Sequence, residues 1–150
     1  MIYLGADHRG FELKERLKVF LEEEGYEFED LGNTVYDPND DYPDFSAAVA
    51  RKVAENLKEN KGILFCGSGV GMDIVANKFK GVRSALVWTD DEKFVKRTRE
   101  TDDTNVLSLP ADYLSQTQVE RIVKLWLEAP KASEERHIRR VRKIKDFEKR

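Results

Sequence analysis

The fold of this chain is decided by one stretch, Lys61-Gly-Ile-Leu-Phe-Cys66-Gly-Ser-Gly-Val-Gly71-Met-Asp-Ile-Val-Ala-Asn-Lys78. It opens with a short apolar run that is typical of a buried strand, and it closes with apolar residues at helical spacing. A glycine-rich segment lies between the two. A strand, a glycine-rich turn and the start of a helix together present free backbone N–H groups to an anion. The stretch therefore predicts an anion-binding turn.

Three glycines alternate through this turn, at Gly67, Gly69 and Gly71. Glycine can adopt a positive φ and lets a ligand come close to the backbone, so we expect both properties here. The spacing matches neither the P-loop pattern nor the usual dinucleotide-binding pattern. The turn by itself is compatible with a nucleotide, a sugar phosphate or no ligand.

The only cysteine of the chain, Cys66, stands where the strand meets the turn. A free cysteine is often a small buried apolar side chain. At a helix N-terminus, however, the positive end of the helix dipole stabilises a thiolate. The flanking glycines favour exposure in a loop over burial in a core. We therefore expect Cys66 to be an exposed, functional thiol.

The composition is that of one globular domain covering residues 1–150. Of the 150 residues, 40% are hydrophobic and 37% are charged, which is enough for a core and unlike a disordered chain. The net charge of -3 gives no indication of nucleic acid as a partner. We see no bilayer-spanning apolar run and no leader, which predicts no membrane partner. With a single cysteine, a reducing cytoplasm is the expected location.

The charge is distributed unevenly. Residues 131–150 carry nine basic and four acidic side chains, a charge of +5, while the rest of the chain has a charge of -8. Within this basic tail, Arg136 and Arg140 are one helical turn apart, so their guanidinium groups share a face and can clamp a phosphate. A solvated basic face and a nucleic-acid-binding tail are the alternatives.

Apolar periodicity predicts strands that alternate with helices. We expect strands at residues 2–6, 26–31, 63–65, 82–87 and 105–109, and a last helix over 134–149. We also expect Asp44 to be the N-cap of the second helix and Gly81 to close the third. This order predicts an α/β fold: a single-domain three-layer αβα sandwich with a five-stranded, mostly parallel, Rossmann-like sheet and a C-terminal helical tail.

Polar residues follow the first strand and occupy the long loop before the second helix. Ligands of such sheets bind beyond the carboxyl ends of the strands, so Asp7 and His8 should face Cys66. His8 could then bind phosphate or act as an acid, although Asp7 could instead cap the following helix. Tyr42, in the long loop, could cover the crevice or be part of a plain connection.

Six segments in order carry a family pattern: Gly5-Ala-Asp-His-Arg-Gly-Phe-Glu-Leu-Lys14, Asp41-Tyr-Pro-Asp44, Cys66-Gly-Ser-Gly-Val-Gly-Met72 with Ala76-Asn77-Lys78, Gly81-Val-Arg83, Asp103-Thr-Asn-Val-Leu107 and Glu135-Arg-His-Ile-Arg-Arg140. Together they resemble the type B ribose-5-phosphate isomerases and the related galactose-6-phosphate isomerase subunits. The resemblance covers nearly the whole chain.

The resemblance implies an aldose–ketose isomerase that interconverts ribose 5-phosphate and ribulose 5-phosphate, in the pentose phosphate pathway, with no metal and no organic cofactor. Cys66 would be the base that moves a proton between neighbouring carbons through an enediolate. The amides from Gly67 to Gly71, with the Ser68 side chain, would hold the developing oxyanion, as preorganised donors do.

The resemblance also implies which residues contact the substrate. Asp7 and Tyr42 would contact the sugar, and three residues would bind the phosphate: His8, Arg136 and Arg140. In the family these arginines come from a partner subunit, which implies a homodimer or a dimer of dimers. Residues 131–150 would then pack on the partner.

The sequence departs from the family pattern before the fifth strand. Thr101 and Asp102 stand where the family commonly has histidine and asparagine, and that histidine is credited with opening the sugar ring. Asp102 remains a candidate substrate contact. Asp73 replaces a usual serine. Threonine cannot shuttle a proton near neutral pH, which leaves three functions open: the ribose reaction, isomerisation of another sugar phosphate that is open-chain or a hexose, or binding without catalysis.

Overall fold

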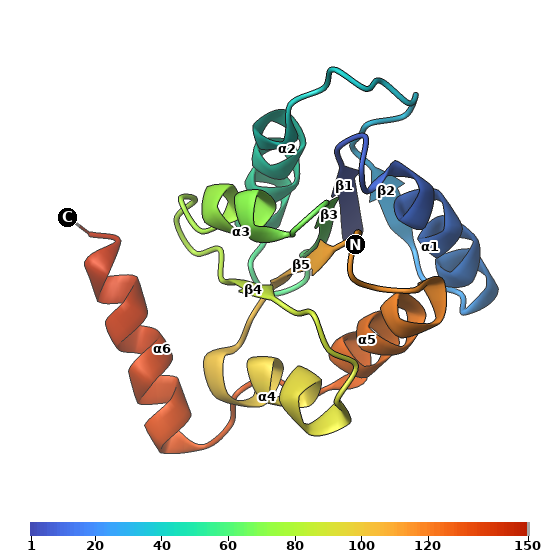
Figure 1. The fold of residues 1–150 in the computed structure, drawn as a ribbon. Coiled ribbons are helices and arrows are strands. Elements are labelled where there is room, and N and C mark those ends of the chain that lie inside the picture. Colours follow the sequence, from blue (N-terminus) through green and yellow to red (C-terminus); the bar gives the residue numbers. More distant parts are fainter. Residues whose placement is uncertain (150) are drawn as a thin grey trace.

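The computed structural model describes residues 1–149, in which five strands alternate with six helices (Figure 1). The strands are β1 (Ile2–Ala6), β2 (Phe28–Asp30), β3 (Lys61–Cys66), β4 (Ser84–Leu86) and β5 (Val106–Pro110). The helices are α1 (Phe11–Glu23), α2 (Tyr42–Glu55), α3 (Val70–Ala76), α4 (Glu92–Asp102), α5 (Gln116–Glu128) and α6 (Glu135–Phe147).

The strands form one sheet in the order β2-β1-β3-β5-β4, and all four neighbouring pairs are parallel. The predicted α/β architecture is therefore confirmed. In the register of the three central strands, Ala6 pairs with Phe65, and Phe65 pairs with Leu109. Their carboxyl ends thus reach the same edge of the sheet. The order reverses between β1 and β3, and such a switch point is where open α/β sheets bind ligands.

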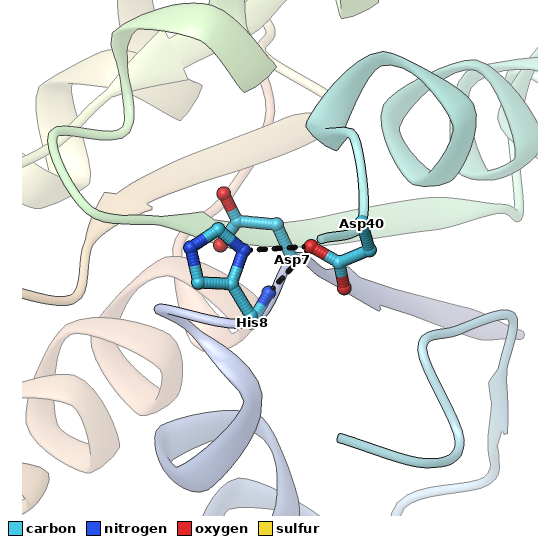
Figure 2. A group of neighbouring side chains, drawn as sticks. All are labelled: Asp7, His8 and Asp40. Atoms are coloured by element: carbon cyan, nitrogen blue, oxygen red, sulfur yellow. Dashed lines mark hydrogen bonds and ion pairs between the residues drawn. The ribbon is translucent and has the colours of Figure 1, made fainter. Parts of the chain in front are cut away.

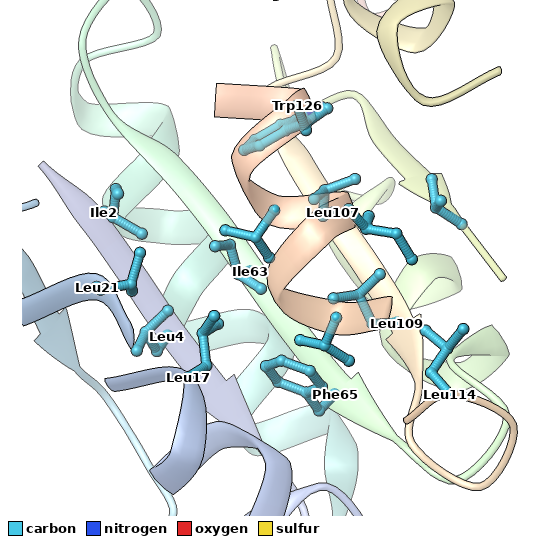
Figure 3. Close-up of a cluster of buried hydrophobic side chains, with 14 of the residues drawn as sticks. Ile2, Leu4, Leu17, Leu21, Ile63, Phe65, Leu107, Leu109, Leu114 and Trp126 are labelled. Atoms are coloured by element: carbon cyan, nitrogen blue, oxygen red, sulfur yellow. The ribbon is translucent and has the colours of Figure 1, made fainter. Parts of the chain in front are cut away.

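Two apolar clusters cover the two faces of the sheet and give the three layers. On one face, β1, β3 and β5 pack against α1, α4 and α5, with Trp126 fully buried (Figure 3). On the other face, α2 and α3 cover a smaller cluster that contains Tyr3, Leu64 and Met72. Successive strand residues point to opposite faces, which is why these strands read as continuous apolar runs.

Two predicted helix boundaries are wrong. Helix α2 begins at Tyr42 with a proline in its first turn, so its N-cap is Asp41, and Asp44 lies inside the helix. Helix α3 ends at Ala76, and Gly81, with φ of 81°, lies beyond it in the following turn. Proline is favoured at the start of a helix because its missing N–H has no intrahelical acceptor there. Because of this preference, α2 begins at Tyr42, before the position predicted from the sequence.

Helix α6 leaves the body of the molecule and packs against α4 (Figure 1). Val141 and His137 are buried, as one side of the helix requires, but Ile138 and Ile144 are each 42% exposed. The apolar side of α6 predicted from the sequence is therefore only partly covered by its own chain. Among residues 1–149, no helix combines the length and the apolar character needed to cross a membrane.

Candidate active site

Cys66 is the last residue of β3, the central strand of the sheet. It is paired with Pro110 of β5, and its side chain belongs to the apolar cluster under α2 and α3. It is only 3% exposed, so the prediction of an exposed thiol is wrong. The strand carries Cys66 down to the floor of the switch-point crevice before the glycine-rich turn begins. A thiol in this position is sheltered from solvent but open to a ligand in the crevice.

An open cleft of about 420 Å³ lies over this thiol at the carboxyl edge of the sheet. Its walls come from the turns after β1, β3 and β5 and from the starts of α2 and α3. The lining residues are Asp7, Arg9, Tyr42, Cys66, Gly67, Ser68, Val70, Gly71, Ile74 and Asp112. The structure thus brings together six of the residues singled out from the sequence: Asp7, Tyr42, Cys66, Gly67, Ser68 and Gly71.

The turn after Cys66 offers unused hydrogen-bond donors to this cleft. Within residues 1–149, the backbone N–H groups of Gly67, Ser68 and Gly69 have no acceptor. The exposed Ser68 side chain accepts a hydrogen bond from the Val70 N–H at 3.3 Å. Three free N–H groups ahead of a helix form a concave site that favours a negatively charged oxygen.

The three glycines of the turn are required for different reasons. Of the three, Gly69 alone uses the freedom to adopt a positive φ, with a value of 73°. At Gly71, an added Cβ would lie 2.6 Å from the ring of Tyr42. At Gly67, it would lie 2.7 Å from Nε of Arg9. These two glycines make room for neighbouring side chains, which a local pattern cannot reveal.

Asp7 follows β1 and holds the turn that leads into α1. Its Oδ1 accepts hydrogen bonds from the N–H groups of Arg9, at 3.0 Å, and Gly10, at 3.2 Å. Burial raises the pKa of Asp7 above its usual value, although these two hydrogen bonds and the neighbouring His8 oppose the rise. Asp7 therefore lines the cleft, as expected of a residue that faces Cys66, and it also tethers the start of α1, as expected of a helix-capping residue.

His8 is held by Asp40, a residue that the sequence patterns do not single out (Figure 2). Oδ1 of Asp40 is 2.8 Å from Nδ1 of His8 and accepts from the His8 N–H at 2.9 Å, while Oδ2 accepts from Nδ2 of Asn33 at 2.6 Å. The pairing spans 32 residues. A carboxylate at Nδ1 fixes the orientation of the imidazole and leaves Nε2 as its free nitrogen.

Among residues 1–149, one group of three side chains resembles a metal-ligand set. Asp7, His8 and Asp40 each offer one ligand atom, and these atoms lie within 4.8 Å of one another. The Asp40 carboxylate, however, is already engaged by His8 and Asn33. The cluster therefore functions as a hydrogen-bonded support for the β1–α1 turn.

Two residues that line the cleft, Arg9 and Asp112, form an ion pair that the sequence patterns also miss. The two residues are 103 positions apart, so only the folded chain reveals the contact. Hydrogen bonding to the Asp112 carboxylate raises the pKa of Arg9. Asp112 lies in the turn after β5, beside the turn that follows Cys66.

Two candidate residues, His8 and Gly69, are chain neighbours of lining residues but do not line the cleft themselves. Three further candidates lie away from it: Asp102, Arg136 and Arg140. Thr101 and Arg136 instead line a separate pocket of about 960 Å³ between α4 and the start of α6. Asp102 is exposed at the end of α4, next to the Thr101 hydroxyl at 2.6 Å. Arg140 is exposed on α6. One chain therefore does not bring these groups to Cys66.

Asp73 occupies the first turn of α3, directly behind the glycine-rich turn. Burial raises its pKa, and the hydroxyls of Ser84 and Ser108 partly offset that rise. These two hydroxyls are 2.9 Å apart and lie on β4 and β5. Among residues 1–149, Oδ1 of Asp73 is buried and has no hydrogen-bond partner.

The structure combines an all-parallel α/β sheet with a thiol that lies beside free backbone amides at the switch point. This combination defines a class of small-molecule-binding α/β proteins. The family described as "Ribose/Galactose Isomerase" matches residues 2–144. The chain belongs to this family.

Relatives match along essentially the full chain. A probable ribose-5-phosphate isomerase B of Mycoplasma genitalium is 40% identical over 99% of this chain and 95% of its own length. The ribose-5-phosphate isomerase B of Mycobacterium tuberculosis is 36% identical, over 99% of this chain and 90% of its own.

Solved structures show the same fold. The Mycoplasma genitalium enzyme with bound ribulose 5-phosphate superposes with a TM-score of 0.94, at 40% identity over 99% of this chain and 95% of that chain. The type B enzyme of Trypanosoma cruzi gives 0.90 at 34% identity, with 99% and 95% covered.

Proposed function

We propose that this protein is an aldose–ketose isomerase that interconverts ribose 5-phosphate and ribulose 5-phosphate. The observation that carries the proposal is the position of Cys66. Its thiol lies at the floor of a cleft and next to the free N–H groups of Gly67, Ser68 and Gly69. A base beside preorganised donors is the arrangement that proton transfer next to a carbonyl requires. The full-length relatives named ribose-5-phosphate isomerase B support the choice of sugar.

The proposed reaction moves one proton between two carbons. The Cys66 thiolate takes the proton from C2 of the open-chain aldose, and the electron pair of that bond forms the double bond of an enediolate. Negative charge moves to the carbonyl oxygen, where the free amides of the turn stabilise it. A proton shifts from O2 to O1 of the enediolate, and the thiol then returns its own proton to C1, which yields the ketose with its carbonyl at C2. No oxidant or second substrate is needed.

The remaining candidates have proposed binding roles. Asp7 and Tyr42 line the cleft and would contact the sugar hydroxyls. His8, oriented by Asp40, would donate to the phosphate. Arg136 and Arg140 would complete phosphate binding, because two guanidinium groups on one helical face suit a phosphate dianion. Asp102 would contact substrate from the end of α4.

These last three residues can reach a substrate only from another copy of the chain, so we propose a homodimer, alone or paired into a tetramer. Arg136 and Arg140 lie outside the Cys66 cleft, on a helix that projects from the body (Figure 1). The partly exposed Ile138 and Ile144 of α6 offer apolar surface for a partner. A location in the reducing cytoplasm suits a working thiol.

A second candidate substrate rests on Thr101. Ribose 5-phosphate is mostly a closed ring in water, and no imidazole lies among the described residues that line the Cys66 cleft. An open-chain sugar phosphate would need no ring opening. The choice between the two substrates depends on whether the protein handles the cyclic form at enzymatic rates.

The deciding experiment is proton NMR of ribose 5-phosphate with the protein in deuterated water. We expect ketose to form, with deuterium entering the position next to the carbonyl, and Cys66→Ala to abolish both signals. Activity only on a short open-chain aldose phosphate would favour the second candidate. Binding of both sugars without turnover would identify a non-catalytic relative and contradict the proposal.

A further inference from the structure

The cleft around Cys66 has an uneven charge. Of the described residues that line it, Arg9 is the only basic one, while Asp7 and Asp112 are acidic. A phosphate monoester carries close to two negative charges near neutral pH. The cleft of one chain therefore repels such a ligand unless Arg9 takes part in binding it.

The contact between Arg9 and Asp112 leaves part of the guanidinium free. Nε donates to Oδ2 at 2.9 Å and to Oδ1 at 3.2 Å, and Nη2 donates to Oδ2 at 2.5 Å. Among residues 1–149, no acceptor is bonded to Nη1 of Arg9. A guanidinium is a rigid planar fork, so holding one edge fixes the direction in which the other edge points.

Backbone contacts fix Asp112 relative to the catalytic turn. Its N–H donates to the Gly67 carbonyl at 3.0 Å, and the Ala111 N–H donates to the Cys66 carbonyl at 2.9 Å. A Cβ added at Gly67 would lie 2.7 Å from Nε of Arg9 and 2.8 Å from Oδ2 of Asp112. The ion pair therefore lies directly against the turn that offers free N–H groups.

We propose that Arg9 is a specificity-determining residue that binds the phosphate of the sugar through Nη1, and that Asp112 is a positioning residue that holds Arg9 over the turn. This inference rests on the proposed function for the identity of the sugar. It gives each chain a phosphate-binding cation of its own, in addition to the arginines proposed to come from a partner. It also explains why an acidic side chain lies at the rim of a site for an anion.

The test compares five variants: Arg9→Gln, Arg9→Lys, Asp112→Asn, the double variant of Arg9→Gln with Asp112→Asn and, as a control, Arg16→Gln. Arg16 is a matched arginine on α1, 51% exposed against 56% for Arg9, and is paired with Glu12. The measurements are KM and kcat for ribose 5-phosphate and the competitive inhibition constant of inorganic phosphate. All variants should fold, because exposed ion pairs contribute little to stability.

We expect Arg9→Gln to raise both KM and the phosphate inhibition constant about tenfold, which is typical of one lost charged hydrogen bond, with a smaller change in kcat. Arg9→Lys should recover part of the loss because it keeps the charge but not the fork. Asp112→Asn should raise both constants about threefold, and it should add nothing in the Arg9→Gln background because coupled residues are not additive. Arg16→Gln should match wild type.

An unchanged phosphate inhibition constant in Arg9→Gln would overturn the role of Arg9. An undiminished effect of Asp112→Asn in the absence of Arg9 would overturn the positioning role of Asp112. If wild type does not turn over ribose 5-phosphate, calorimetric titration of wild type and Arg9→Gln with inorganic phosphate still decides the inference. Failure of the inference and failure of the proposed function therefore give different results.

Discussion

The Cys66 cleft and the α4–α6 pocket are built in opposite ways. The cleft is formed at the ends of buried strands, and long-range hydrogen bonds fix side chains that line it, such as Arg9 to Asp112. The α4–α6 pocket is larger, about 960 Å³, and is lined by exposed charged side chains such as Arg136. Backbone and long-range contacts within one chain therefore fix the cleft, whereas exposed charged side chains form the α4–α6 pocket, and we propose that this second surface serves a partner subunit.

The largest expected effect comes from the floor of the cleft. Cys66→Ala should lower kcat about 10³-fold, because it removes the base while the cleft and its amides remain. Steady-state kinetics, with the phosphate inhibition constant as a control for intact binding, provides the measurement. Near-normal turnover would contradict the proposal that the cleft is the reaction centre, since the thiol would then be only a packing group.

The second effect tests whether the two surfaces meet across subunits. Arg136→Ala should lower kcat/KM about 30-fold by removing a charged contact to phosphate. When the Cys66→Ala and Arg136→Ala proteins are mixed and allowed to exchange subunits, activity should return to about a quarter of wild type, because half of the dimers are mixed and each has one intact site. If mixing restores no activity, Arg136 does not complete the Cys66 site of a partner subunit.

The third prediction compares buried and exposed ion pairs in the two regions. Lys14 is a fully buried residue of α1 and pairs with Asp30 of β2, whose carboxylate also accepts from the Gly32 N–H. Asp30→Asn should lower the free energy of unfolding by about 2 kcal/mol, since it leaves a buried ammonium poorly paired. Glu134→Gln, which breaks an exposed pair with Arg136, should leave urea denaturation unchanged. Equal losses of unfolding free energy in the two variants would contradict this difference between buried and exposed ion pairs.

The smallest effect is a pH dependence at Asp30. Burial alone would raise the pKa of Asp30, but hydrogen bonds from Lys14, Gly32 and Lys18 outweigh it and place the pKa below its usual 3.8. The charged carboxylate therefore stabilises the folded state above about pH 4, and this contribution is lost as the pH falls through the lowered pKa. Below pH 4, wild type should lose stability more steeply than Asp30→Asn in acid titrations followed by circular dichroism.

Local patterns in the sequence predicted much of the fold and the floor of the site. Alternating strand and helix periods gave the parallel sheet, and the apolar run before Cys66 placed it at a strand end. The same local logic failed on its burial, because exposure depends on the packing of α2 and α3 over the turn. Glycines beside a cysteine are typical of an exposed loop, whereas two of the glycines here, Gly67 and Gly71, make room for neighbouring side chains.

The residues that the sequence did not reveal are those joined over long separations. Asp40 meets His8 across 32 positions, and Asp112 meets Arg9 across 103. Each is an ordinary aspartate in a loop, and aspartate is common in loops for local reasons. One signal in the sequence could have identified Asp112. It is a polar residue that follows a parallel strand, and the carboxyl ends of neighbouring parallel strands share one edge of the sheet.

The alternating glycines of the turn have a consequence for how this site can change by mutation. A library randomised at the three positions should return mostly glycine at each. The positions differ, however, in which substitutions elsewhere would make another residue tolerable there. A smaller residue in place of Tyr42 would open space at Gly71, and smaller residues in place of both Arg9 and Asp112 would do so at Gly67. At Gly69 the restriction lies in the backbone, with φ of 73° and the Leu109 carbonyl carbon 3.1 Å from an added Cβ. Two of the three glycines therefore have second-site suppressors within reach, and Gly69 is the fixed point around which variants of this site can evolve.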